Sequence, residues 1–312
     1  MATFPVILSF LSLLAIGFGL PTGCPYTDDL SPCSCKRLPF GLQVVCANFN
    51  SSHHLIKAFR ILKDYQVHTV LLHALHIPEF LPSDLFDGLK IKEMRVEKSN
   101  LRFSQPAFKG LDASLYVLNV AEQSHIKSRD RFSLAKLTRL HELYVQSNNV
   151  EKVEDTWLNE KVPNVEKLVL DSNDISDMEE HAFANLASLK VISLADNRIK
   201  RISRSMFPKP ATHLMRIDLS YNEISSLPGN FFEDMPSLTE IILSGNELKT
   251  IEQKTWEPVW ERLTKILLFD NQIECGENLT WMKRTRRPQI IEGNCAAPKN
   301  MIGHPITDVY KT

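Results

Sequence analysis

The stretch that decides the fold reads Val165-Glu-Lys-Leu-Val-Leu-Asp-Ser-Asn-Asp-Ile175, and it returns as Leu214-Met-Arg-Ile-Asp-Leu-Ser-Tyr-Asn-Glu-Ile224. Apolar residues hold positions 1, 4, 6 and 11 of this pattern, and asparagine holds position 9. Copies spaced by 24 or 25 residues begin at Val67, Ile91, Leu115, Leu140, Val165, Leu189, Leu214, Leu238 and Leu263. Self-similarity at such a period indicates a solenoid, in which each repeat buries its apolar face only by stacking on its neighbours.

Within each copy, apolar and variable residues alternate. Leu168 and Leu170 alternate with Lys167, Val169 and Asp171, which is the period-two pattern of a short strand with one buried face. Nine such strands, stacked side by side, predict a parallel sheet on the concave side of a curved rod.

Position 9 predicts a ladder of buried asparagines. A carboxamide donates and accepts hydrogen bonds at once, so stacked copies can satisfy the backbone where the chain leaves each strand. The last six repeats hold Asn148, Asn173, Asn197, Asn222, Asn246 and Asn271. The first three hold Leu75, Ser99 and Gln123 there, and we expect the ladder to be less regular in that part.

A second row of large residues recurs 17 to 19 residues into eight repeats. Its members are Phe86, Phe108, Phe132, Trp157, Phe183, Phe207, Phe232 and Trp256. We interpret the row as core packing on the convex side, because eight aromatics in register are explained by a shared layer and not by a ligand pocket.

Charge and motifs favour a binding protein over an enzyme. The chain has 36 basic and 37 acidic residues, which gives no reason to expect a nucleic-acid or anionic-membrane partner. No hydrolase, metalloprotease, P-loop or dinucleotide motif occurs, so we expect no catalysis and no cofactor. A metal-site interpretation of His53, His54, His68, His73 and His76 is less favoured than surface and packing roles, because His68 and His73 point to opposite faces of one strand. We therefore expect no metal.

The N-terminus predicts export. Residues 4–15 are almost wholly apolar, the first charged residue is Asp28, and the run has the length of a signal-peptide core rather than of a membrane span. No second apolar run of spanning length follows. We expect a signal peptide over residues 1–19 and a secreted, extracellular product with no membrane span.

Six cysteines cluster at the two ends of the chain, which fits an oxidising compartment. Spacing alone leaves three connectivities open for Cys24, Cys33, Cys35 and Cys46. The remaining two, Cys275 and Cys295, lie 20 residues apart, so a bridge between them would contribute roughly 3 kcal/mol in the chain-entropy model.

With its repeats and these cysteine-bearing ends, the chain resembles the animal extracellular leucine-rich-repeat family over about residues 24–305. The resemblance implies a horseshoe with a parallel concave sheet, an irregular convex side and disulfide-bonded caps. It also implies the pairs Cys24–Cys35 and Cys33–Cys46. The C-terminal cap departs from the family, because Glu277 takes the place of a second cysteine and no cysteine follows Cys295; the bridge Cys275–Cys295 remains.

The expected organisation is a signal peptide over 1–19, an N-terminal cap over 20–66, nine repeats over 67–274 and a C-terminal cap and tail over 275–312. Sequons at Asn50 and Asn278 predict glycosylation in the caps. The basic run Lys283–Arg287 is interpreted as the solvated side of a cap helix with Trp281 and Met282 inward; a glycosaminoglycan or processing-protease site is the alternative.

Binding in this family is mostly on the concave face, where positions 5 and 7 project. The candidate binding residues in this chain are Arg95, Tyr144, Val169, Asp171, Asp218, Ile242, Leu267 and Phe269. We expect Ile242, Leu267 and Phe269 to form one exposed apolar patch of the kind that marks interaction sites, unless the C-terminal cap folds over them.

The leading hypothesis is a secreted module that binds an extracellular protein partner of unknown identity through the concave face. One alternative is a structural or matrix protein that self-associates. Another follows from a narrower resemblance to secreted arthropod members of the family, such as the non-catalytic subunit of the deep-sea shrimp luciferase, which implies a companion enzyme chain that this protein stabilises.

Overall fold

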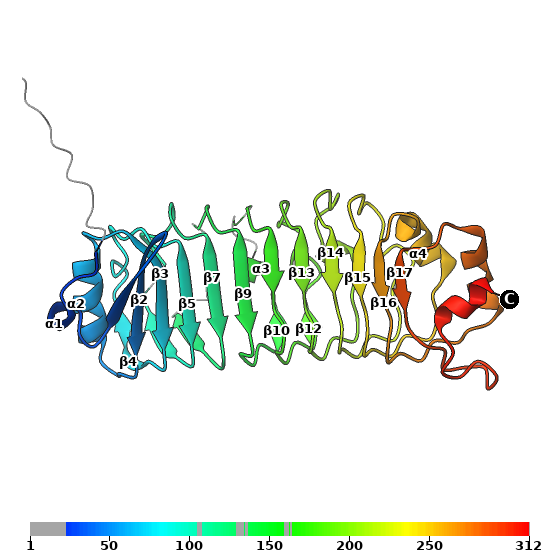
Figure 1. Cartoon of the computed structure of the whole chain (residues 1–312), viewed down its shortest axis with the longest axis horizontal. Helices are drawn as coiled ribbons and strands as arrows, with labels where there is room; N and C mark the ends of the chain where they lie inside the picture. Colours follow the sequence, from blue (N-terminus) through cyan, green and yellow to red (C-terminus); the bar gives the residue numbers. More distant parts are fainter. Residues whose placement is uncertain are drawn as a thin grey trace, which may run out of the picture.

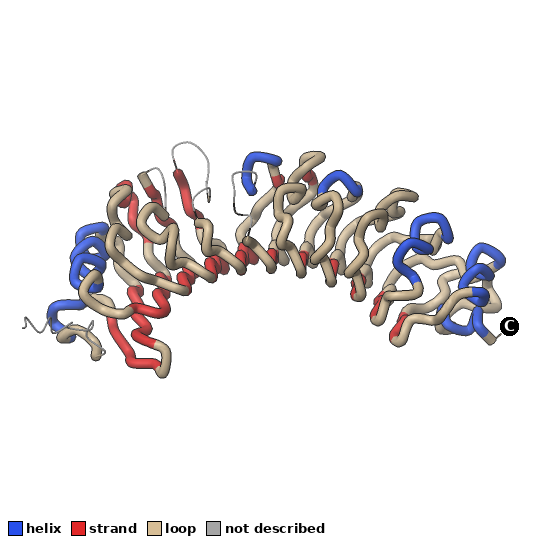
Figure 2. Tube along the Cα trace, turned by 90° about the horizontal axis from the view of Figure 1, so that it is seen from above, coloured by secondary structure: helices blue, strands red, loops and turns tan. Residues whose placement is uncertain are grey.

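The chain folds into an arc of stacked repeats. The computed structural model describes residues 23–311 except 105–107, 129–133, 135–136, 159–161 and 163. The expected signal peptide and Phe132 lie outside the described residues, as does the side chain of Trp157. Figure 1 shows a long row of strands that runs from one cap to the other. In Figure 2 the strands of this row lie along the inner side of the arc, whereas loops, short helices and a few further short strands lie along the outer side.

Within the described residues, one sheet of twelve strands forms the concave side. Its strands in order are β1 (Ser34–Leu38), β2 (Gly41–Ala47), β3 (Val67–His73), β5 (Glu93–Glu97), β7 (Val117–Ala121), β9 (Glu142–Gln146), β11 (Lys167–Val169), β13 (Val191–Ser193), β14 (Arg216–Asp218), β15 (Glu240–Ile242), β16 (Lys265–Leu267) and β17 (Ile290–Glu292). Neighbours pair in parallel, apart from the antiparallel hairpin of β1 and β2. Position 4 pairs with position 4 from repeat to repeat, as Leu168 does with Leu143 and Ile192.

Both caps continue this sheet. Strand β2 precedes the first repeat and pairs with β3, whereas β17 follows the last repeat and pairs with β16. The short helix α1 (Thr27–Leu30) and the helix α2 (Ser52–Leu62) close the N-terminal end, where α2 buries Leu55, Phe59 and Leu62. The caps therefore end the solenoid by extending the sheet, with β1 and β2 at one edge and β17 at the other, and by covering the exposed ends of the core.

The convex side combines short regular elements with turns. It carries a three-stranded parallel sheet, a two-strand pair and several helical turns within the described part of the chain. These are β4 (His76–Leu81), β6 (Asn100–Phe103), β8 (His125–Ser128), β10 (Lys152–Val153), β12 (Asp177–Met178), α3 (Asp155–Leu158), η1 (Arg204–Met206), α4 (Gln253–Trp260), η2 (Glu277–Arg284) and η3 (Ile306–Tyr310). The expectation of an irregular convex side thus holds for most of its length, with the exception of the first repeats.

Aromatic side chains fill the core behind the strands. All six members of the predicted row whose side chains are described are at most 3% exposed: Phe86, Phe108, Phe183, Phe207, Phe232 and Trp256. Neighbouring rings touch, with centroids 6.0 Å apart for Phe86 and Phe108 and 5.0 Å apart for Phe232 and Trp256. The layer also enters the C-terminal cap, because Trp260 lies against Trp281 at 4.8 Å.

Three disulfides close the caps. They join Cys24 to Cys35, Cys33 to Cys46 and Cys275 to Cys295, and no free cysteine is found among the described residues. These are the pairs that the family resemblance implies. The N-terminal bridges fix the hairpin of β1 and β2, whereas the C-terminal bridge encloses η2 and β17.

The asparagine ladder ties each repeat to the one before it. The Asn197 side chain donates from Nδ2 to the carbonyls of Leu170 and Leu194 at 3.0 Å and accepts from the Ile175 backbone N–H at 3.0 Å through Oδ1. Asn222 and Asn246 bond in the same way one and two repeats later. Each buried carboxamide thus bonds to backbone groups of two repeats, and the N–H that it accepts from would otherwise be left unpaired in the core.

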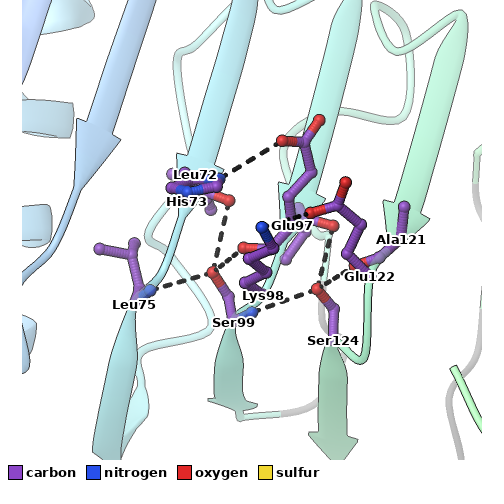
Figure 3. Close-up of polar contacts among 10 residues, drawn as sticks. Leu72, His73, Leu75, Glu97, Lys98, Ser99, Ala121, Glu122 and Ser124 are labelled. Carbon is purple, nitrogen blue, oxygen red and sulfur yellow. Dashed lines mark hydrogen bonds and ion pairs between the residues drawn. The ribbon is translucent and has the colours of Figure 1, made fainter. Parts of the chain in front are cut away.

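The ladder is less regular in the third repeat, as the sequence predicts, and its member there stands one residue later than position 9. Ser124 takes the place, and Gln123 is exposed, because this repeat has one extra residue in its turn, where Glu122 and Gln123 both have positive φ. Serine also serves in the second repeat, as Figure 3 shows. The Ser99 hydroxyl donates to the Leu72 and Glu97 carbonyls at 3.3 and 2.7 Å, and it accepts from the Leu75 N–H at 3.1 Å.

A left-handed residue precedes the ladder position in every repeat. Position 8 has φ between 49° and 68° in Ala74, Lys98, Glu122, Ser147, Ser172, Asp196, Tyr221, Gly245 and Asp270. Only the eighth repeat uses glycine there. A Cβ at Gly245 would lie 2.5 Å from Cδ1 of the Tyr221 ring, so glycine at this position makes room for that ring.

Replacing one ladder residue should destabilise the protein strongly. Asn197→Ala removes the partner of the buried Ile175 N–H and one of the two carboxamide donors to each of the Leu170 and Leu194 carbonyls. We expect a loss of about 3 kcal/mol in the free energy of unfolding. Urea unfolding followed by circular dichroism measures it. The control Asn185→Ala, at an exposed convex asparagine, should stay within about 0.5 kcal/mol of the wild type. Equal effects of the two variants would contradict the ladder's role.

Candidate functional site

The concave face is formed by odd positions of each strand. In β9, Leu143 and Val145 are buried, whereas Glu142, Tyr144 and Gln146 are half-buried on the other face. The same alternation runs along β5 and β7. Positions 3, 5 and 7 therefore supply the side chains of the inner surface, whereas positions 4 and 6 belong to the core.

The structure spreads the sequence-predicted candidates from the second repeat to the ninth. Two candidates are exposed, namely Arg95 on β5 and Phe269 just after β16. Three are half-buried: Tyr144 on β9, Asp171 after β11 and Leu267 on β16. The other three are buried: Val169 on β11, Asp218 on β14 and Ile242 on β15. Two groups are neighbours in register. Val169 lies beside Tyr144, and Ile242 lies between Asp218 and Leu267.

The expected apolar patch near the C-terminal cap is smaller than predicted. Ile242 is only 7% exposed, because the side chains of Asp218 and Leu267 flank it on the two adjacent strands. Phe269, at 39% exposure, and the half-buried Leu267 remain as its accessible part. The cap contributes beside the patch, since Glu292 of β17 pairs with Leu267.

Tyr144 is held in place by charged neighbours on both sides. Its hydroxyl donates to the Glu142 carboxylate, and the Lys167 ammonium lies 5.1 Å from the ring centroid in a cation–π contact. Burial, followed by the hydrogen bond to Glu142, raises the pKa of the Tyr144 phenol above its ordinary value. Because β9 is the sixth of the twelve strands, this ordered ring lies near the middle of the face.

Asp171 and Asp218 accept hydrogen bonds from neighbouring residues. Asp171 Oδ1 accepts from the Ser193 hydroxyl at 2.6 Å and from the Ala195 N–H at 2.9 Å. Asp218 accepts from Ser220 and pairs with Arg216 at 3.1 Å. Burial raises the pKa of the Asp171 carboxyl, an effect that its hydrogen bonds oppose. Both carboxylates are therefore fixed parts of the surface.

Sequence reasoning missed the position 3 residues, which share this face. Glu142 and Lys167 order Tyr144, and Glu93 pairs with Arg95 at 2.6 Å. The signal was present, because a period-two strand places positions 3, 5 and 7 on one side. The strand assignments alone would have added this row to the candidates.

A groove of about 790 Å³ lies at the edge where the first strands begin. Its lining includes two exposed aromatic rings, Phe40 from the turn of the cap hairpin and Tyr116. The Tyr116 ring stacks on His141 with centroids 4.2 Å apart. Glu93 and Val117, which begin β5 and β7, also line the groove. A partner on the concave face can therefore extend over this edge.

Two kinds of feature are not found in the described part of the chain. No group of three or more histidine, cysteine, aspartate or glutamate side chains is arranged to hold a metal ion. None of the described helices has the length and apolar composition needed to cross a membrane.

Comparisons with known proteins show the fold. The leucine-rich-repeat family model matches residues 138–199, 163–211 and 212–273. The matched region begins with the repeat that holds Asn148, the first asparagine of the ladder, and it leaves out the repeats with leucine or serine there. No curated protein matches the chain, so these comparisons give no support to the narrower resemblance to the luciferase subunit.

Two solved structures are similar over most of the chain. One is in the octameric complex of Latrophilin 3, Unc5D and FLRT2, in which FLRT2 contributes the leucine-rich repeats. It has a TM-score of 0.65 and 18% sequence identity, and the match covers 88% of this chain and 96% of that chain. The other is in the TLR13–ssRNA13 complex. It has a TM-score of 0.53 and 19% sequence identity, and the match covers 75% of this chain and 40% of that chain. The chain is thus a leucine-rich-repeat solenoid with disulfide-bonded caps.

The raised pKa of Asp171 makes stability depend on pH. A carboxyl whose pKa is higher in the folded state contributes stability at low pH that is lost as the pH rises through that pKa. Asp171→Asn keeps an acceptor at Oδ1 and removes the charge. We expect it to raise the free energy of unfolding at pH 7 by less than about 1 kcal/mol.

The gain should vanish below about pH 3, where the wild-type carboxyl is protonated. Urea unfolding at the two pH values measures both effects. A variant less stable than the wild type at pH 7 would show that the hydrogen bonds outweigh the burial of the charge.

Proposed function

We propose that this chain is an extracellular binding module that recognises a protein partner through its concave face, with Tyr144 as the central anchor. The carrying observation is an ordered aromatic ring near the middle of a twelve-stranded face, fixed by Glu142 and Lys167. Figure 2 shows this face on the inner side of the arc, away from the helices and loops of the convex side.

Tyr144 is ordered before any partner binds, because Glu142 and Lys167 already hold its ring. Tyrosine is enriched among the residues that dominate protein interfaces, and such residues cluster near the interface centre. A ring already held in one orientation loses little conformational entropy when a partner covers it. The charged residues around it carry both signs, as Glu142, Lys167 and Asp171 do, which suits a protein surface better than a uniformly charged polymer.

The similar solved structures support the kind of partner. FLRT2 is found in a complex with Latrophilin 3 and Unc5D, which are proteins. The low identity shows only the shared fold, so the partner class for this chain is part of the proposal. A solenoid face offers one broad surface to a folded partner.

The location outside the cell is supported by independent features of the chain. Three disulfides persist in an oxidising compartment, and the apolar run before Ala15 fits a cleaved signal over residues 1–19. The sequon residues Asn50 and Asn278 are both exposed in the caps. Secretion and glycosylation therefore belong to the same proposal.

Replacing Tyr144 should weaken partner binding. Affinity capture with the intact secreted chain, read by mass spectrometry, identifies the partner, and titration then gives dissociation constants. We expect Tyr144→Ala to weaken binding about 30-fold, because truncating a central aromatic residue costs about 2 kcal/mol or more. Tyr26→Ala, at a tyrosine 84% exposed in the N-terminal cap, is the matched control and should leave affinity unchanged.

Other outcomes redirect the proposal. The binding site would be assigned to the C-terminal patch if Tyr144→Ala left partner affinity unchanged and the double variant Leu267→Ala and Phe269→Ala lost it. A stable dimer or larger assembly by light scattering, without any partner, would favour the self-associating matrix protein. Capture of a secreted enzyme that is stable only together with this chain would favour the non-catalytic subunit.

Export leaves chemical marks that mass spectrometry detects. From an animal secretory host we expect the mature chain to begin near Leu20 and to carry N-glycans at Asn50 and Asn278. Asn50→Gln and Asn278→Gln should each remove one glycan, and enzymatic deglycosylation should leave the double variant's mass unchanged. A product that retains residues 1–19 and lacks glycan would contradict the extracellular location.

A further inference from the structure

The C-terminal cap presents a short, strongly basic segment. Trp281 and Met282 of η2 are buried, whereas Lys283 and Arg284 at its end are exposed. The segment continues to Arg286 and Arg287, both exposed, before β17 begins. We call these four residues the cap cations: Lys283, Arg284, Arg286 and Arg287. This pattern, with Trp281 and Met282 buried and the cations exposed, agrees with the interpretation of the basic run as the solvated side of the cap helix. It does not say which ligand the cations bind.

Several exposed cations of the repeats pair with acidic side chains of a neighbouring repeat. Lys98 pairs with Glu122 at 3.2 Å, and Lys200 pairs with Glu223 at 3.4 Å. Arg198 likewise pairs with Asp174 at 2.6 Å. In each pair the partners lie about one repeat apart in sequence, because the stacking places them on adjacent turns. The repeat architecture thus supplies each of these charges with an opposite charge.

The cap cations have no such partners. They follow the ninth repeat, so no further repeat supplies acidic side chains next to them. None of the four forms an ion pair with a described residue. Arg287 lies over the ring of Tyr310, whose centroid is 5.5 Å from Cζ. A chain of net charge −1 therefore carries a concentrated positive field at one end.

We propose that the cap cations bind a sulfated polysaccharide of the heparin type. Guanidinium groups pair with sulfates and carboxylates through two parallel hydrogen bonds, and a linear polyanion presents such groups in series. This inference rests on the extracellular location in the proposed function, and it is independent of the concave face.

Two other polyanionic surfaces fit less well. Single-stranded nucleic acid needs exposed aromatic rings on which bases stack, but Trp281 is buried and Arg287 lies over Tyr310. An anionic membrane would favour an amphipathic element with a free apolar side, but Leu279, Trp281 and Met282 of η2 are directed into the core. The polysaccharide requires neither feature.

The test compares two variants with equal loss of charge. The intact glycosylated chain is titrated with a heparin-derived oligosaccharide at about 0.15 M salt, where charges beyond about 8 Å are screened. Lys283→Gln, Arg284→Gln and Arg286→Gln are combined, and Arg287 is kept for its contact with Tyr310. We expect binding about tenfold weaker than that of the wild type, since three exposed charge contacts are lost.

The matched control combines Lys98→Gln, Arg198→Gln and Lys200→Gln, whose wild-type side chains are 60–71% exposed and ion-paired. It should bind within about twofold of the wild type. Equal losses in both variants would show that net charge alone matters and would overturn the proposal. Equal binding of desulfated heparin, or binding only to phosphatidylserine vesicles, would overturn it as well.

A measurement on the wild type guards against misfolded variants. Heparin should protect Lys283 from acetylation by an amine-reactive reagent, read by mass spectrometry, more than it protects Lys98. Equal protection would contradict the assignment. Tyr144→Ala should keep full heparin binding, so failure of the concave-face proposal and failure of this one give different results.

Discussion

The ladder carboxamide is the interaction on which the rest of the structure depends. Each asparagine amide joins the backbone of its own repeat to that of the repeat before, as Asn197 does through Leu170, Leu194 and Ile175. The chain reaches this geometry only by turning through a left-handed residue at position 8, a conformation that costs non-glycine residues roughly 1–2 kcal/mol. Buried hydrogen bonds offset that cost, because unpaired backbone groups would cost more. The turn and the amide therefore fix the repeat length together.

Once the turn is fixed, the two sides of the solenoid have different roles. Strands on the inner side lie about 4.8 Å apart, whereas the outer side must hold rings as large as Phe232 and Trp256 between its turns. Wider spacing outside than inside bends the rod, and Figure 2 shows the strands on the inner curve. Positions 4, 6 and 9 are consumed by packing and by the ladder, so positions 3, 5 and 7 are those at which sequence can vary without loss of fold. The proposed concave recognition surface is built from these positions for that reason.

Much of this could be read from the sequence, and the misses have physical causes. The repeat starts, the asparagines from Asn148 onward and the aromatic layer follow from periodicity, because each obeys one local constraint repeated many times. Ser124 was missed because one extra residue, which gives this turn two consecutive left-handed residues, shifts the register without breaking the apolar pattern. Ile242 was expected to be exposed, but exposure on a concave sheet depends on the size of side chains one strand away, as with Asp218 and Leu267. The ordering of Tyr144 likewise depends on contacts between adjacent repeats, which a single repeat cannot reveal.

Charge balance over the whole chain says less about partners than its arrangement does. A cation such as Lys200 faces Glu223 on the next turn, well within the screening length of about 8 Å at physiological ionic strength, so its field is largely cancelled for any polymer approaching the repeats. The cap cations follow the last repeat, and none of them has such a partner among the described residues. The near-neutral composition of the whole chain therefore does not argue against a polyanion at the C-terminal cap. Four exposed cations within residues 283–287 create a local positive field that the total charge does not reveal.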